Sequence, residues 1–163
     1  MRSALITVLL LLLLFVSCKD KPAQKTLFDL VENTGINFNN KVADQELENS
    51  FLFRNFYNGG GVAIGDINND GLSDVMLSSN MGENKLYLNE GNFKFKDITP
   101  NSGMKQDSMW STGLAMADVN ADGWLDIYVC NSGHMQNGNR RNKLYINNHN
   151  LTFTESAKQY GLD

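Results

Sequence analysis

The stretch DINNDGLSD (66–74) returns as DVNADGWLD (118–126), and this repeat decides the predicted fold. Each copy places carboxylates or an asparagine at positions 1, 3, 5 and 9, with a glycine at position 6. Carboxylates that lie so close together repel one another unless a cation lies among them. The repeat therefore predicts two equivalent cation-binding loops.

The match between the two copies extends well beyond the acidic loops. GGGVAIGDINNDGLSDVMLSS (59–79) aligns with STGLAMADVNADGWLDIYVCN (111–131), and NKLYLNEGNFKFKDIT (84–99) aligns with NKLYINNHNLTFTESA (142–157). The second copy carries a six-residue insertion within SGHMQNGNRR (132–141). Internal repetition with a period of about 50 residues indicates a propeller, a solenoid or an array.

A shorter box occurs three times, each time with an acid and with a glycine followed by an aliphatic residue. The three copies are FDLVENTGI (28–36), KDITPNSGM (96–104) and TESAKQYGL (154–162). The box closes both long repeats and also precedes the first one, so residues 28–58 read as an extended segment with a partial repeat.

Each long repeat has the apolar pattern of four short strands separated by glycine or asparagine. In the first repeat we expect strands at 62–64, 74–77, 85–88 and 93–96. Four strands in about 40–50 residues are typical of one propeller blade. The sequence thus predicts an all-β fold with two four-stranded β-propeller blades, 59–104 and 111–163. Known propellers have about 4–8 blades, so two blades form an incomplete propeller.

The N-terminus reads as a targeting segment. An apolar run from Ala4 to Val16 follows Arg2 and is too short to span a bilayer, which takes roughly 20 residues. Phe15-Val16-Ser17-Cys18 resembles a bacterial lipobox, with Phe15 where leucine is usual. We expect a signal peptide over 1–17, lipid on Cys18 and a polar tether over 18–27. An ordinary signal peptide or an uncleaved anchor is the alternative.

Charge and cysteine content exclude several classes of function. The formal net charge is −4, and cleavage after Ser17 would remove Arg2 and make it −5. A nucleic-acid-binding protein needs a basic surface, which this chain lacks. If Cys18 carries lipid, Cys130 has no partner for an intrachain disulfide, and its apolar surroundings predict a small core residue.

The oxygen-rich loops favour calcium over other cations. Calcium takes six to eight oxygen ligands in a flexible geometry, whereas magnesium demands a compact octahedron. Each loop offers four side-chain donors and one backbone carbonyl at position 7. The predicted ligands are Asp66, Asn68, Asp70, Leu72 and Asp74 in the first loop, and Asp118, Asn120, Asp122, Trp124 and Asp126 in the second.

Position 12 distinguishes these loops from two other calcium-binding motifs. An EF-hand requires a glutamate at position 12 and flanking helices, but Leu77 and Val129 occupy that position inside expected strands. A dockerin-type loop also needs an acid there. A turn rich in Asx residues that binds no metal is the remaining alternative.

The stretches GVAIGDINNDGLSDVMLSS and GLAMADVNADGWLDIYVCN, each followed by NKLY, resemble the FG-GAP (VCBS-type) repeat family. The resemblance covers residues 28–163 and implies calcium-bearing propeller blades like those of integrin α-subunit heads, with the ten ligands named above. The chain is also similar to the amino-terminal part of large surface lipoproteins of bacteria.

No catalytic set is recognisable in the sequence. His134 and His149 lie in loops without a partner at motif spacing, and no serine elbow, zinc pattern or phosphate loop occurs. Trp110, Trp124, Tyr57 and Tyr87 are candidates for stacking on a sugar, but packing is the expectation for most of them. Trp110 and Tyr57 are expected to be buried, and Tyr87 and Tyr145, at equivalent positions in the two repeats, are expected to pack.

Two functions follow as hypotheses. The first is a non-enzymatic calcium-binding scaffold with two Ca²⁺ sites. Its lipid anchor would hold it at the bacterial cell envelope, on the outer membrane or cell surface, where it would bind a glycan or a protein. The second is a truncated amino-terminal piece of a larger envelope enzyme. In either case further blades would come from a longer chain or from other copies, and nucleic acid is not expected as a partner.

Overall fold

A computed structural model describes residues 27–105, 109–132 and 140–163 of this chain. The predicted signal peptide, Cys18, most of the tether and His134 lie outside the described residues. The chain divides into two compact units, 1–31 and 32–163. Residues 27–31, the described part of the first unit, form no helix or strand, and the following paragraphs concern the second unit.

The first sheet contains four antiparallel strands in the order β1-β2-β3-β4. Its strands are β1 (Val62–Gly65), β2 (Asp74–Leu77), β3 (Lys85–Asn89) and β4 (Phe95–Asp97). Each strand pairs with the next one along the chain, as in a propeller blade.

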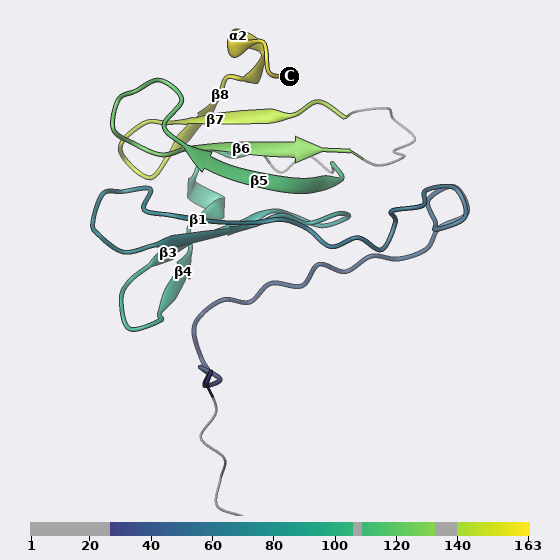
Figure 1. Cartoon of the computed structure of the whole chain (residues 1–163), viewed down its shortest axis with the longest axis horizontal. Helices are drawn as coiled ribbons and strands as arrows, with labels where there is room; N and C mark the ends of the chain where they lie inside the picture. The colour runs from purple at the N-terminus through teal and green to yellow at the C-terminus, as the bar shows by residue number, and fades with distance from the viewer. Residues whose placement is uncertain (1–26, 106–108, 133–139) are drawn as a thin grey trace, which may run out of the picture. The chain divides into compact units, whose positions relative to one another are not determined.

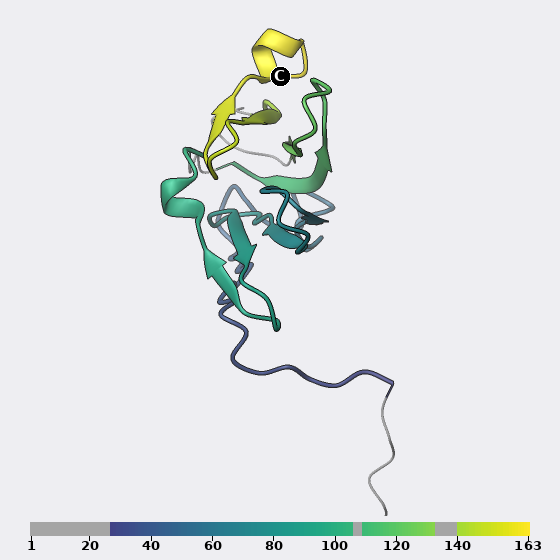
Figure 2. The ribbon, with the colours of Figure 1, turned by 90° about the vertical axis from the view of Figure 1, so that its left-hand side faces the viewer.

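The second sheet repeats this order with β5 (Ser111–Ala117), β6 (Asp126–Asn131), β7 (Lys143–Asn147) and β8 (Phe153–Glu155). A 3₁₀ turn, η2 (Thr99–Asn101), follows the first sheet, and a single-turn helix, α2 (Ala157–Tyr160), follows the second. Figure 1 shows the two sheets lying one above the other, and Figure 2 shows η2 on the connection between them. The predicted all-β fold with two four-stranded blades is confirmed.

A hydrophobic core fills the space between the two blades. Met76 and Leu86 face each other across β2 and β3 and are fully buried, as is Ile127 on β6. Alternate residues of a strand point to opposite faces, so the strand pattern that predicted the sheets also selects the buried face. The cluster consists of Ile67, Met76, Leu86, Ile98, Met104, Ile127, Val129, Tyr145 and Phe153.

The hairpin between β3 and β4 corrects one predicted boundary. Residues 93–96 were expected to form a strand, but Phe93 has φ +56° and is 65% exposed. Two hydrogen bonds close the turn, from Glu90 N–H to the Lys94 carbonyl at 2.7 Å and from Lys94 N–H to the Gly91 carbonyl at 2.9 Å. The turn therefore includes Phe93, and the strand begins only at Phe95.

The aromatic predictions have mixed outcomes. Tyr87 and Tyr145 are buried, as their equivalent positions predicted. Trp110 is also buried and packs against Phe53 and Phe56, with ring centroids 5.7 and 5.2 Å away. The prediction for Tyr57 is wrong, because this residue is 63% exposed and its hydroxyl donates to Asp44.

Cys130 is a free thiol that is only partly buried. It lies on β6 between the fully buried Val129 and the buried Asn131, on the opposite face from both. It is therefore outside the core cluster, which corrects the prediction of a core position.

Candidate metal centre in the paired acidic loops

Each acidic stretch forms the loop of a hairpin that opens its blade. The first loop joins β1 to β2, and Gly65 pairs with Asp74 at its base. The second joins β5 to β6, and Ala117 pairs with Asp126 at the same place. The first and last carboxylates of each nine-residue stretch are therefore brought to the base of one tight turn.

The two loops have the same backbone conformation. Asn69 and Gly71 have φ values of +59° and +85°, and the corresponding Ala121 and Gly123 have +60° and +86°. Glycine adopts this left-handed region without steric cost, whereas alanine does so at a cost of about 1–2 kcal/mol. Asn69 and Ala121 occupy the same position of the two loops, so the loop geometry overrides the local preference of the alanine.

The first, third and fifth side chains turn toward amides of their own loop. In the first loop, Asp66 accepts hydrogen bonds from Asp70 N–H at 3.1 Å and Gly71 N–H at 2.8 Å. The Asn68 amide donates to Asp70 Oδ2 at 2.8 Å, and Leu72 N–H donates to Asp70 Oδ1 at 2.8 Å. In the second loop, Asp118, Asn120 and Asp122 make the same bonds.

The ninth residue braces the loop against the rest of the blade. Asp74 is fully buried and accepts hydrogen bonds from Ile67 N–H at 2.9 Å and Asn89 N–H at 2.7 Å. Asp126 does the same, with Val119 N–H at 3.1 Å and Asn147 N–H at 2.8 Å. Each of these carboxylates thus ties the start of its loop to the end of the third strand.

Burial is the main reason why the pKa of Asp74 lies above the usual range of a carboxyl group. The two backbone N–H donors lower this pKa, and the negative charges of Asp70 and Asp66 raise it further. The three carboxylates are therefore close enough to repel one another, which is the condition that a bound cation relieves.

A calcium ion requires six to eight oxygen ligands. Each loop supplies carboxylate and amide oxygens, which suit a hard cation, and its glycine provides the sharp turn that brings them together. In the first loop each carboxylate oxygen of Asp66 and Asp70 accepts one hydrogen bond from the described residues, and such an oxygen has lone-pair capacity for more. The donor types fit calcium.

The side chains as placed do not form a finished coordination shell. Among the described residues, no three His, Cys, Asp or Glu side chains gather into a group that would hold a metal ion. The ten predicted ligands lie in two equivalent loops, and their role as calcium ligands stays a prediction.

The two loops contact each other. The Asn69 side chain donates to the Gly123 carbonyl at 3.1 Å, which joins the tip of the first loop to the turn of the second. The Asn147 amide donates to the Ile67 carbonyl at 2.8 Å and to the Leu125 carbonyl at 3.1 Å, so it bridges both loops. A change in one loop therefore has a direct route to the other.

The second loop has a partner that the first one lacks. His149, from the hairpin between β7 and β8, places Nε2 3.0 Å from Asp122 Oδ2. Its ring stacks on Trp124, with centroids 4.7 Å apart and an angle of 16° between the planes. The His149 hydrogen bond is the main reason why the pKa of Asp122 lies below its usual range, with support from Trp124 N–H. Leu72 and Gly91 occupy the corresponding positions of the first blade.

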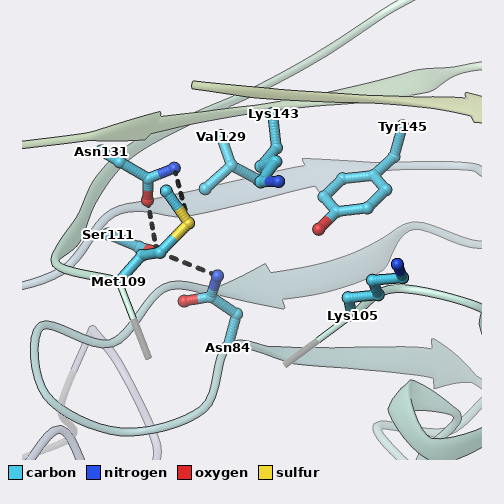
Figure 3. Close-up of a pocket in the computed structure, with 8 residues that line it drawn as sticks. All are labelled: Asn84, Lys105, Met109, Ser111, Val129, Asn131, Lys143 and Tyr145. Atoms are coloured by element: carbon cyan, nitrogen blue, oxygen red, sulfur yellow. Dashed lines mark hydrogen bonds between the residues drawn. The ribbon is translucent and has the colours of Figure 1, made fainter. Parts of the chain in front are cut away.

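A second polar cluster lies between the blades at the start of β5 and the end of β6 (Figure 3). Asn84 donates to Ser111 Oγ at 3.1 Å, and Ser111 Oγ donates to Asn131 Oδ1 at 2.8 Å. The Asn131 amide contacts Met109 Sδ at 3.8 Å and donates to the Arg141 carbonyl at 2.7 Å. These bonds join strands and connections, so the cluster has a structural role.

Sequence reasoning found the loops but missed three residues that complete them. Asn89 and Asn147 follow NKLY in both repeats, and their recurrence was the available signal. His149 was interpreted as a solvated loop histidine, which the contacts with Asp122 and Trp124 correct. Its partner on the second loop is distant in sequence, so no motif spacing reveals the contact.

Comparison with known proteins identifies the repeat. A model of the FG-GAP-like repeat matches residues 66–129, which include both acidic loops. Cartilage acidic protein 1 of Xenopus tropicalis is 36% identical over 107 residues, or 64% of this chain and 16% of that protein. The mouse protein of the same name is 36% identical over 73 residues, which are 45% of this chain and 11% of that protein.

An integrin shows the same repeat. Integrin alpha-8 of Gallus gallus is 30% identical over 106 residues, which are 56% of this chain and 10% of the integrin. The chain thus matches only a small part of the length of these relatives. No helix within the described ranges has the length and apolar character needed to cross a bilayer. Residues 66–129, which include both acidic loops, therefore carry the FG-GAP-like repeat.

Proposed function

We propose that this chain is a calcium-stabilised binding module, in which two blades present their loops to a glycan or protein. The observation that carries the proposal is the pair of acidic loops with one shared backbone conformation and one shared set of hydrogen bonds. Similarity to an integrin and to cartilage acidic protein 1 supports a role in adhesion rather than catalysis.

Calcium would act here as a structural ion. Asp66, Asn68, Asp70 and Asp74 would hold it in the first loop, together with the Leu72 carbonyl, and the equivalent residues would hold a second ion. Each ion would neutralise carboxylates that repel one another at the tip of a blade. At millimolar calcium, a site of the affinity usual for extracellular modules adds about 1–2 kcal/mol of stability.

The location belongs to the same proposal. The lipobox-like sequence that ends at Cys18 would place the module at the bacterial cell envelope, on the outer membrane or cell surface. The alternative, a piece of a larger envelope enzyme, is compatible with the small share of each relative that the chain matches. No relative named above carries the name of an enzyme.

Calorimetric titration of the purified chain with calcium tests the proposal. We expect two bound ions and a rise in melting temperature that EDTA reverses. Asp66→Ala should remove one ion, and Asp118→Ala should remove the other. Absence of saturable binding in the folded chain would leave the loops as metal-free Asx turns.

The His149 contact allows a second test, because it involves the second loop and has no equivalent at the first. Because His149 engages Asp122 Oδ2, it competes with a cation for that oxygen in the second loop only. We expect His149→Ala to strengthen binding at the second loop and to leave the first unchanged. A uniform effect on both sites would contradict the assignment of one ion to each loop.

A further inference from the structure

The ninth carboxylates of the two acidic loops are joined by a short chain of buried hydrogen bonds. Asp74 accepts Ile67 N–H at 2.9 Å, and the carbonyl of the same Ile67 accepts the Asn147 side-chain amide at 2.8 Å. Asn147 N–H in turn donates to Asp126 at 2.8 Å. None of these residues is more than 3% exposed, so water does not compete for the bonds. The chain of bonds therefore links the base of the first loop to the base of the second.

The equivalent asparagine of the first blade makes no such connection. The described hydrogen bonds of Asn89 all lie within the first blade, and its side-chain amide donates to the Ser73 carbonyl at 2.9 Å. The Asn147 amide makes the matching bond to the Leu125 carbonyl at 3.1 Å and adds the bond to Ile67. Asn89 thus supports the loop of its own blade, whereas Asn147 also holds the loop of the other blade.

The contact at the loop tips is weaker than this buried chain of bonds. The Asn69 side chain donates to the Gly123 carbonyl at 3.1 Å, and both residues are exposed. Water competes for a hydrogen bond at an exposed tip, while a buried one gains from the low local dielectric. The bond between Asn147 and Ile67 is therefore the main polar connection between the two loops.

A connection of this kind favours filling both loops over filling one. The loop oxygens now bond to groups of their own loop, as Asp70 does with the Asn68 amide, so each loop must rearrange before its oxygens face one ion. A rearranged first loop would hold Asp74 and Ile67 in place, and the Ile67 carbonyl would then hold Asn147. Residues ordered by the first ion need no further ordering for the second, which gives positive cooperativity.

Charge acts in the opposite direction. The first loop has the carboxylates of Asp66, Asp70 and Asp74, and a calcium ion would neutralise two of these negative charges. The second loop would then attract its own ion less strongly. Salt weakens this effect, because the Debye length falls from about 8 Å at 0.15 M ionic strength to about 3 Å at 1 M. A titration in about 1 M potassium chloride therefore reports mainly the coupling through hydrogen bonds.

We propose that the contact between Ile67 and Asn147 couples the two loops, so that calcium in one loop raises the calcium affinity of the other. This inference rests on the proposed function, because it requires a calcium site in each loop. The coupling is reciprocal by thermodynamic linkage and should be about fivefold or more. It leaves the affinity of each loop alone unchanged, so the effect of His149 on the second loop is a separate property.

Calcium titrations of single-loop variants measure the coupling. Asp66→Ala disables the first loop and Asp118→Ala disables the second, and neither residue belongs to the buried chain of bonds. Each variant gives the association constant of the loop that remains. We expect the product of the two stepwise constants of the native chain to exceed the product of these single-loop constants about fivefold or more. Calorimetry in about 1 M potassium chloride provides all four constants.

Two matched asparagine variants assign the coupling to its contact. Asn147→Ala and Asn89→Ala each remove the amide that supports the loop of the same blade. Only Asn147→Ala also removes the bond to Ile67. When each change is introduced into the native chain and into the single-loop variants, Asn147→Ala should reduce the ratio of products to about one. Asn89→Ala should keep the ratio at about fivefold or more.

Nuclear magnetic resonance covers the case in which Asn147→Ala does not fold. Calcium is added to the Asp118→Ala chain, in which only the first loop can bind. We expect the side-chain amide signals of Asn147 to shift as the first loop fills. The amide of Asn131, in the polar cluster at the other end of β6, is the control and should not shift.

The results separate this inference from the proposed function. Two bound ions with a ratio of products of one would overturn the coupling and leave the proposed function intact. An equal loss of coupling in Asn147→Ala and Asn89→Ala, or an Asn147 amide that does not respond, would also overturn it. A folded native chain that binds no calcium would overturn the proposed function and the coupling together.

Discussion

The ninth residue of each acidic loop differs from the other carboxylates in its surroundings. Asp74 and Asp126 are buried and accept backbone N–H groups from two separate segments, whereas Asp70 and Asp122 lie at the exposed loop tip. When an exposed carboxylate is removed, water replaces it as the acceptor for its hydrogen-bond donors. A buried one leaves its donors without any partner, and an unsatisfied buried donor costs about 1–3 kcal/mol.

We therefore expect Asp74→Ala to destabilise the chain by about 2–4 kcal/mol even in EDTA, since one buried and one partly buried N–H donor lose their acceptor. Asp70→Ala is the control and should cost less than about 1 kcal/mol under the same conditions, because water replaces its carboxylate. Urea unfolding followed by circular dichroism gives both values. Equal losses for the two variants in EDTA would show that the Asp74 carboxylate does not brace the loop.

The turn that follows the fourth strand explains why the second and third boxes contain an acid. Asp97 Oδ1 accepts Thr99 N–H at 2.9 Å, and Glu155 accepts Ala157 N–H at 2.9 Å after β8. In both blades the acid fixes the turn that leads away from the fourth strand. Asp97 also lies 3.2 Å from Lys85 Nζ on the neighbouring strand. One side chain thus joins the hairpin to the turn that follows it.

The pKa of Asp97 makes the stability of the turn after β4 depend on pH. Partial burial raises the pKa, but the Thr99 and Lys85 donors outweigh it and hold the pKa below the usual carboxyl range. A depressed pKa contributes stability above the unfolded value of about 4, and this contribution is lost as the pH falls through the folded value. Because the Asp97 side chain is 35% exposed, we expect it to contribute only about 0.5–1 kcal/mol to the free energy of unfolding.

Asp97→Asn removes the titrating group and tests this expectation. The free energy of unfolding of the native chain should fall more steeply between about pH 5 and pH 2.5 than that of the variant. Above pH 6 the native chain should be the more stable of the two. Parallel pH profiles for both proteins would mean that Asp97 titrates as in the unfolded chain.

At the scale of the whole molecule, the two blades share one core and should unfold as one unit. Ile127 is fully buried in this core, and Ile→Ala in such a position costs about 2–5 kcal/mol. We expect Ile127→Ala to lower the stability of both blades together, with tryptophan fluorescence and far-ultraviolet circular dichroism reporting one transition. Leu72→Ala, at an exposed loop position, is the control and should change little. Two separate transitions in Ile127→Ala would contradict a shared core.

Sequence pattern predicted the parts of this molecule that depend on local chemistry. The glycines at 71 and 123 and the short strands that contain Met76 and Leu86 follow from turn geometry and from the apolar pattern, and both were recognised. The bridge made by Asn147 and the contact of His149 with Asp122 depend on how hairpins pack, which no local spacing encodes. Tyr57 was misjudged for the same reason, because Phe53 and Phe56 fill the place beside Trp110.

The stacking of His149 on Trp124 makes the two blades optically distinct. The chain has only two tryptophans, Trp110 in the interior and Trp124 on the second loop, and the first loop has leucine at the matching position. An indole in contact with an imidazole changes its emission when that ring moves away from it. The second loop therefore contains its own fluorescent reporter. A structural change confined to the first loop should leave the tryptophan emission nearly unchanged.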